Sequence, residues 1–184
     1  MKILTVSSSN WGGGLSIFVE EQIESIKKHG IEIDSFLIKG KGVRGYLSNY
    51  SKLVQTIKDN DYDLIHAHFG LSGCLSVLQR TLPVITTFHG GDVDLLRNKP
   101  FSILAMLLSS HSIFVNKNDM KRYETFVKRK SSVIPCGVDL NQTFPLNSIS
   151  NLREKYNFPK EEKIIIFSSS FDRDVKNVSL AKEA

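Results

Sequence analysis

The chain has 184 residues, which is long enough for one large domain or for one domain and part of a second, and its composition is that of an ordinary globular protein. Its net charge of +5 comes from scattered basic residues, so we expect no nucleic-acid partner. The first residues lack the apolar core of a signal peptide, and the most apolar stretch, residues 101–108, is far too short for a membrane span. We therefore expect a cytoplasmic protein whose two cysteines, Cys74 and Cys136, are reduced.

Residues 2–23 predict a strand, a glycine loop and a helix in direct succession. An apolar run is followed by serines, then by Gly12, Gly13 and Gly14, and then by an amphipathic segment. Glycines let backbone N–H groups approach a ligand closely, and the first turn of a helix carries partial positive charge. This order favours a phosphate site, although a simple chain turn is compatible with the same glycines.

The alternation of strand and helix continues along the chain. It predicts an α/β protein with a Rossmann-like open parallel sheet and helices on both faces, because short strand–helix–strand units connect by right-handed crossovers. Further strands are expected within residues 31–38, 61–70, 83–92, 112–116 and 131–134, and helices near residues 46–57, 75–78, 101–108 and 117–130.

Two stretches have two interpretations each. The basic, glycine-rich residues 39–45 are expected to form a solvated mobile loop, with a second phosphate or acceptor contact as the alternative. Leu104, Leu107 and Leu108 are expected to pack in the core, with an exposed apolar face toward an acceptor or a membrane as the alternative.

Histidines gather where two predicted strands end. His66 and His68 close one strand, and His89 follows the next, just before two glycines and Asp92. Ligands of open parallel sheets bind outside the carboxyl ends of the strands, so these residues should face the same crevice as the glycine loop. A zinc site is one interpretation, but no carboxylate or cysteine partner is evident at metal-site spacing, and hydrogen-bonded structural histidines are the favoured alternative.

The composition changes after the sixth strand. We expect a first domain at residues 1–145 and a linker at 146–163 that holds a short helix near residues 152–156. Residues 164–184 begin a new cycle with a strand, a serine-rich loop and a helix start, so we expect them to be the truncated beginning of a second domain.

Taken together and in order, several motifs resemble those of the family 4 glycosyltransferases, which are retaining enzymes of the GT-B fold with two Rossmann-like domains. The matching pieces are the glycine loop, DLIHAH at 63–68, residues 86–92, IPCGVD at 134–139, LREKY near 152, and the strand, loop and lysine that open the second domain. The resemblance covers essentially the whole chain, but such enzymes are about twice this length.

The resemblance implies roles for individual residues. His89 matches the histidine that hydrogen-bonds the donor sugar, and Asp92 supports it. Gly12, Gly13 and Gly14 match the loop that lies near the donor diphosphate or the acceptor. Lys176, assisted by Arg173, is expected to neutralise the diphosphate. His66, His68 and Gly137 are expected on the acceptor side of the cleft. Two positions depart from the family pattern: Cys136 replaces a common asparagine, and Phe171 stands where an arginine is usual.

The function implied is transfer of a sugar from a nucleotide-sugar donor to a sugar or lipid-linked acceptor with retention, without a required metal or other cofactor, as in polysaccharide biosynthesis. The acidic pair that would hold the donor lies beyond residue 184, so we expect the chain alone to be inactive or very weak. Peripheral association with the inner face of the cell membrane stays open. The alternative is a non-catalytic sugar-binding, nucleotide-binding or partner-binding Rossmann-like module.

Overall fold

The computed structural model describes residues 1–9, 13–94, 96, 98–127, 130–140, 149–159, 161–167 and 177–183. The chain divides into two compact units, Met1–Leu140 and Asn141–Ala184. No helix within the described ranges is both long enough and apolar enough to cross a membrane.

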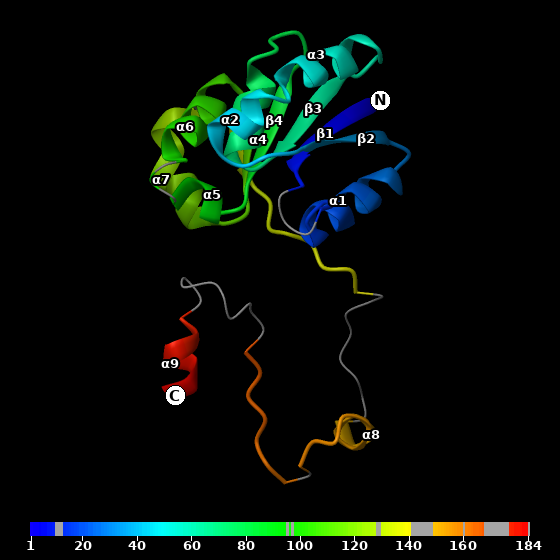
Figure 1. Ribbon diagram of the computed structural model, residues 1–184, viewed down its shortest axis with the longest axis vertical. Helices are drawn as coiled ribbons and strands as arrows, with labels where there is room; N and C mark the ends of the chain where they lie inside the picture. The colour runs from blue at the N-terminus through cyan, green and yellow to red at the C-terminus, as the bar shows by residue number, and fades with distance from the viewer. Residues whose placement is uncertain are drawn as a thin grey trace. The chain divides into compact units, whose positions relative to one another are not determined.

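The first unit is built on a parallel sheet of six strands in the order β2-β1-β3-β4-β5-β6 (Figure 1). This arrangement confirms the predicted Rossmann-like fold. The strands are β1 (Lys2–Ser8), β2 (Glu32–Ile38), β3 (Leu64–His68), β4 (Val84–Phe88), β5 (His111–Phe114) and β6 (Ser131–Val133).

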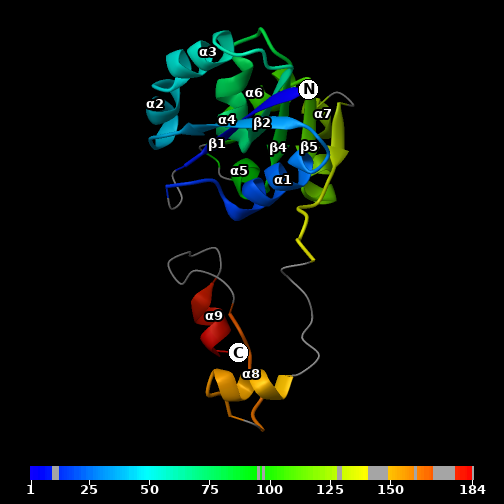
Figure 2. The same cartoon turned by 90° about the vertical axis from the view of Figure 1, so that its right-hand side faces the viewer.

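The strand order determines which face of the sheet each helix covers. The chain moves outward from β1 to β2 and then crosses back to β3, so right-handed crossovers place the first helix on one face and the later helices on the other. Figures 1 and 2 show α1 across the sheet from α3 and α4. The helices of this unit are α1 (Ile17–Lys27), α2 (Gly42–Leu47), α3 (Tyr50–Lys58), α4 (Gly70–Val77), α5 (Gly91–Asp94), α6 (Lys99–Leu108) and α7 (Lys117–Val127).

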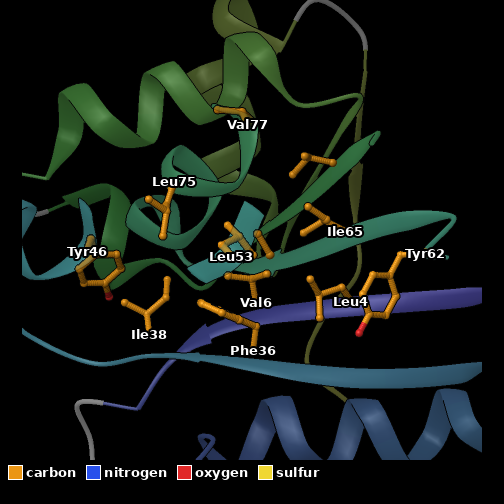
Figure 3. Close-up of a cluster of buried hydrophobic side chains, with 12 residues drawn as sticks. Leu4, Val6, Phe36, Ile38, Tyr46, Leu53, Tyr62, Ile65, Leu75 and Val77 are labelled. Atoms are coloured by element: carbon orange, nitrogen blue, oxygen red, sulfur yellow. The ribbon is translucent and has the colours of Figure 1, made fainter. Parts of the chain in front are cut away.

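Two clusters of buried side chains form the core on the face that carries the later helices. The first joins β1, β2 and β3 to α2, α3 and α4, and Figure 3 shows Leu4, Val6, Phe36 and Leu75 within it. The second joins β4 and β5 to α6 and α7 around the stacked rings of Phe88 and Phe114. Removal of this apolar surface from water is the main stabilising contribution to the unit.

The region after β2 differs from its prediction in two ways. Residues 46–57 were expected to form one helix, but the structure has α2 and α3 with a break at Ser48 and Asn49. The side-chain amide of Asn49 donates to the carbonyls of Lys39 and Gly45, which fixes the break. Residues 39–44 of the predicted loop are exposed, but the chain is helical from Gly42 onward. The backbones of Gly40 and Gly45 pack against each other, which allows a helix to start there.

The predicted core position of Leu104, Leu107 and Leu108 is wrong. These side chains are 37%, 43% and 45% exposed. The buried stripe of α6 consists instead of Ser102, Ala105 and Met106, at the spacing of one helical face. The leucines lie on the neighbouring stripe and are exposed, whereas contact of this stripe with an acceptor or a membrane stays a prediction.

The second unit contains two helices in its described parts, α8 (Ile149–Lys155) and α9 (Val178–Glu183). The short helix expected near residues 152–156 is present, but it starts earlier. The strand expected from residue 164 onward is wrong for the described residues 164–167, which have no regular secondary structure. A strand requires a partner strand for its backbone hydrogen bonds, and here Ile165 is 92% exposed.

Candidate functional site

Two adjacent strand ends place the candidate residues at the carboxyl edge of the sheet. β3 ends at His68, and β4 ends at Phe88, directly before His89. The register pairs Thr5 with His66 and His68 with Thr87, so these residues share the face that carries α1. The intervening Ile65 and Ala67 point to the apolar cluster on the opposite face.

The carboxylate of Asp92 joins the loops that follow β3 and β4. Its Oδ2 accepts a hydrogen bond of 2.8 Å from the backbone N–H of Gly70, and its Oδ1 accepts one of 3.0 Å from the N–H of His89. Burial raises the pKa of this carboxyl to about 6, although the two N–H donors act in the opposite direction. We call this arrangement the Asp92 clamp, and it fixes the backbone of His89 relative to β3.

Close packing of helices supports the Asp92 clamp. A Cβ atom at Gly70 would lie 2.0 Å from Ser102 Oγ, so only glycine allows α4 to begin against α6. Ser102 Oγ in turn donates to the carbonyl of Asp92 at 3.0 Å. Phe69, just before the helix, has a φ of +71°, a strained conformation for a residue with a side chain.

Three imidazoles form a continuous cluster at this edge. The rings of His66 and His68 are 4.4 Å apart, and those of His68 and His89 are 5.5 Å apart. His66 Nε2 is 2.8 Å from Thr87 Oγ1, and His68 Nδ1 is 3.2 Å from His89 Nε2. His66 and His68 are therefore both buried and hydrogen-bonded through one ring nitrogen.

Burial controls the charge of this cluster. Burial, together with the neighbouring His89, lowers the pKa of His66 to about 4, and burial alone lowers the pKa of His89 to about 4. Burial holds the pKa of His68 well below its usual value, and the two other histidines act in the same direction. All three imidazoles are neutral at pH 7, so each nitrogen is either a donor or an acceptor.

His89 is the member of the cluster that reaches outward. Its Nδ1 lies 3.8 Å from Cys136 Sγ, which follows β6, and its ring is 4.6 Å from the ring of Phe69. Burial raises the pKa of the Cys136 thiol, so this sulfur is a neutral and weak hydrogen-bond partner. His89 can therefore offer Nδ1 to a ligand with little competition from the protein.

The sequence matches the family model of Glycosyltransferase Family 4 over residues 16–142, which is more than half of the chain. The chain belongs to glycosyltransferase family 4. Members of this family are retaining enzymes. No curated protein matches the chain.

Solved structures with the same fold are longer than this family 4 chain. HepE of Anabaena, solved in complex with UDP, has a TM-score of 0.58 and 21% identity over 85% of this chain and 50% of its own. HepE with UDP and glucose has a TM-score of 0.57 and 22% identity over the same shares. Sucrose-phosphate synthase of Thermosynechococcus elongatus has a TM-score of 0.64 and 18% identity, over 88% of this chain and 53% of the synthase.

These likenesses show the fold. The six-stranded parallel sheet with its helices corresponds to the N-terminal half of GT-B enzymes, as the sequence led us to expect. The chain spans about half the length of the solved structures that it matches.

The family 4 motifs are only partly brought together. The structure brings together His66, His68, His89 and Asp92 at one edge of the sheet. Gly137 directly follows Cys136, which contacts His89, and a Cβ atom at Gly137 would meet no other atom within 4 Å. Gly13 has a φ of +82°, and neither Gly13 nor Gly14 has an atom within 4 Å of its Cβ position, so there is open space at these two positions. Gly12, Arg173 and Lys176 lie outside the described residues. The described part of the chain contains no group of three potential metal ligands.

Sequence reasoning missed several residues that position the site. Ser102 lies against Gly70, and Thr87 bonds His66. The carboxylate of Asp119, next to the position of Gly90, accepts a hydrogen bond from Asn116, and its charge contributes to the raised pKa of Asp92. Only Thr87 had a signal in the sequence, since it lies near the end of the strand that directly precedes His89.

Proposed function

We propose that the chain forms the acceptor-side half of a retaining glycosyltransferase. The reaction is transfer of a hexose from a nucleotide-sugar donor to a sugar or lipid-linked acceptor. Membership of family 4 supports the reaction class. The observation that carries the proposal for this site is the Asp92 clamp, which holds His89 at the carboxyl edge of the sheet with Nδ1 directed away from the cluster.

In this proposal His89 binds the donor sugar and Asp92 keeps it in place. A neutral imidazole held by a backbone bond and by a second imidazole can hydrogen-bond a sugar hydroxyl without reorganising as the reaction proceeds. The Asp92 carboxylate is occupied by two backbone N–H groups, so we assign it a positioning role. We place His66, His68 and Gly137 on the acceptor side, where the two buried histidines would support the site from within the sheet.

We assign the donor diphosphate to the glycine loop and to two basic residues near the end of the chain. Gly12, Gly13 and Gly14 would approach it from this unit, and Lys176 with Arg173 would neutralise the charge that develops on the leaving group. HepE, which has the same fold, was solved with UDP and with UDP and glucose, which supports a nucleoside diphosphate as the ligand class.

A lipid-linked acceptor would bring the reaction to a membrane surface. We propose a cytoplasmic enzyme in polysaccharide biosynthesis that associates peripherally with the inner face of the cell membrane. Leu104, Leu107 and Leu108 form an exposed apolar stripe on α6, which is compatible with such contact.

The experiment compares two proteins, residues 1–184 alone and residues 1–163 joined to the donor-side domain of another family 4 enzyme, whose own basic residues take the place of Arg173 and Lys176. Each protein, once its folding has been checked by circular dichroism, is incubated with radiolabelled nucleotide sugars and with sugar and lipid-linked acceptors. We expect transfer with retained configuration from the joined protein and little or none from the short chain. Ligand binding without transfer by the folded joined protein would favour a non-catalytic binding module.

A further inference from the structure

The hydrogen bond between His68 and His89 requires one ring to donate and the other to accept. Both imidazoles are neutral at pH 7, and each then carries a single N–H. Either His68 Nδ1 donates to His89 Nε2 across the 3.2 Å contact, or the reverse is true. The two arrangements place opposite groups on the outward Nδ1 of His89, which is a donor in the first case and an acceptor in the second.

The environment of His68 distinguishes these arrangements. Its side chain is fully buried, and its Nε2 has no hydrogen-bond partner among the described residues. If His89 donated to His68, the proton of His68 would have to sit on this Nε2 as a buried N–H without an acceptor. An orphaned buried N–H is rarer and costlier than an unused acceptor lone pair. The favoured tautomer of His68 therefore carries its proton on Nδ1.

We infer that His68 is a positioning residue that fixes the tautomer of His89, because its Nδ1–H donates to His89 Nε2 and keeps the proton of His89 on Nδ1. The contacts of the His89 backbone and ring reinforce this arrangement. The N–H of His89 is bonded to Asp92 at 3.0 Å, and its ring lies 4.6 Å from that of Phe69. Together these contacts limit rotation of the ring, so the two nitrogens keep separate roles.

The consequence is that His89 presents a hydrogen-bond donor at the carboxyl edge of the sheet. In the free protein its nearest partner there among the described residues is Cys136 Sγ at 3.8 Å, a weak acceptor that an oxygen ligand can replace. The preferred ligand atom is an oxygen with a free lone pair, such as a sugar hydroxyl or a phosphate oxygen. The assignment of that oxygen to a donor sugar rests on the proposed function, whereas the tautomer does not.

Nuclear magnetic resonance of the chain labelled with nitrogen-15 at histidine tests the inference without substrate. Long-range proton–nitrogen correlations show which imidazole nitrogen carries the proton, and the five histidines can be assigned by single substitutions. At neutral pH we expect the wild-type His89 to have its proton on Nδ1 and a bare Nε2. A protonated Nε2 on wild-type His89 would overturn the inference, whatever the variants do.

Two variants separate positioning from packing. His68→Asn keeps a donor where Nδ1 lies, because the asparagine amide nitrogen occupies a similar place, whereas His68→Phe keeps the ring shape and removes the donor. We expect His89 to remain Nδ1-protonated in H68N and to shift toward the Nε2-protonated tautomer in H68F. An unchanged His89 tautomer in folded H68F would contradict the inference. If H68F does not fold, the wild-type and H68N spectra still decide it.

The same variants keep this inference distinct from the proposed function. In the joined two-domain protein, H68F should lower the turnover number at least tenfold more than H68N does, with a smaller change in KM. If no protein transfers sugar but the tautomer pattern is as expected, the proposed function fails and the inference stands. If transfer occurs and His89 carries its proton on Nε2, the opposite holds.

Discussion

Replacement of His66 by glutamine should make the protein more resistant to acid. His66 is 7% exposed, and its Nε2 lies 2.8 Å from Thr87 Oγ1. The amide nitrogen of glutamine can reach the place of Nε2 and donate to the same hydroxyl. Glutamine does not titrate, so the substitution removes the proton equilibrium and leaves the hydrogen bond and most of the packing.

The magnitude follows from the pKa of His66, which burial lowers from its usual 6.5 to about 4. Between these values the unfolded chain binds more protons than the folded one, so the free energy of unfolding falls as the pH decreases from 6.5 to about 4. Each unit of pKa difference corresponds to about 1.4 kcal/mol, so this one group accounts for a loss of about 3 kcal/mol. That is a large part of the stability of a small domain.

The assay is urea unfolding of wild type and H66Q at a series of pH values. At neutral pH the two should differ by less than about 1 kcal/mol, and toward pH 4 the stability of H66Q should gain about 3 kcal/mol relative to wild type. The acid-unfolding midpoint of H66Q should move to lower pH. His111→Gln is the matched control, because His111 also bonds a hydroxyl at 2.8 Å, from Ser132, but its ring is only partly buried. Parallel pH profiles of wild type and H66Q would refute the reasoning.

Three further predictions concern the same edge of the sheet. His89→Ala in the joined two-domain protein should lower transfer about 100-fold or more without unfolding it, since a preorganised hydrogen bond is lost, and unchanged turnover would exclude the assigned role. Gly70→Ala should lower the free energy of unfolding by about 1–3 kcal/mol in urea titrations, because its Cβ would lie 2.0 Å from Ser102 Oγ; Gly91→Ala, with nothing within 4 Å, should cost far less. For Asp92→Asn, the pKa of Asp92 is raised from 3.8 to about 6, so the folded state binds the proton more tightly. The stability of wild type relative to D92N should therefore rise by about 3 kcal/mol as the pH falls through this window, and a constant difference would show that the carboxyl does not titrate as described.

The fold could be predicted because its signals are local and repeated. Apolar runs such as residues 31–38 and 112–116 alternate with amphipathic segments, and this alternation leads to a parallel sheet whatever the details of packing. The failures occurred where a tertiary contact overrides a local pattern. Leu104 and Leu108 have helical spacing, yet the stripe that faces α4 is the one with the small residues Ser102 and Ala105.

The sequence predicted which residues lie at the site, but not which hydrogen bonds join them. Parallel strands end at one edge, so His68 and His89 had to be close, and the structure gives 3.2 Å between their ring nitrogens. Nothing in the sequence indicates that Asp92 bonds the backbone of Gly70, 22 positions earlier. The contact depends on the turn at Phe69 and on the approach of α6, which are products of the whole unit.

Burial of polar and ionisable side chains at the carboxyl edge of the sheet lowers the stability of the fold, which indicates that this edge is a functional site. A buried strand face is most stable with apolar side chains, yet here it carries Thr5, His66 and His68, and a buried carboxylate lies nearby at Asp92. The lowered pKa values of the histidines mean that the folded state loses stability as the pH falls. The raised pKa of Asp92 means that the folded state loses stability as the pH rises toward neutral. Natural sequences keep such local conflicts mainly where a site requires them. Within the first unit His68 bonds the ring of His89 and Asp92 bonds its backbone, so His89 is held in place before any ligand arrives, and binding free energy need not be used to order it.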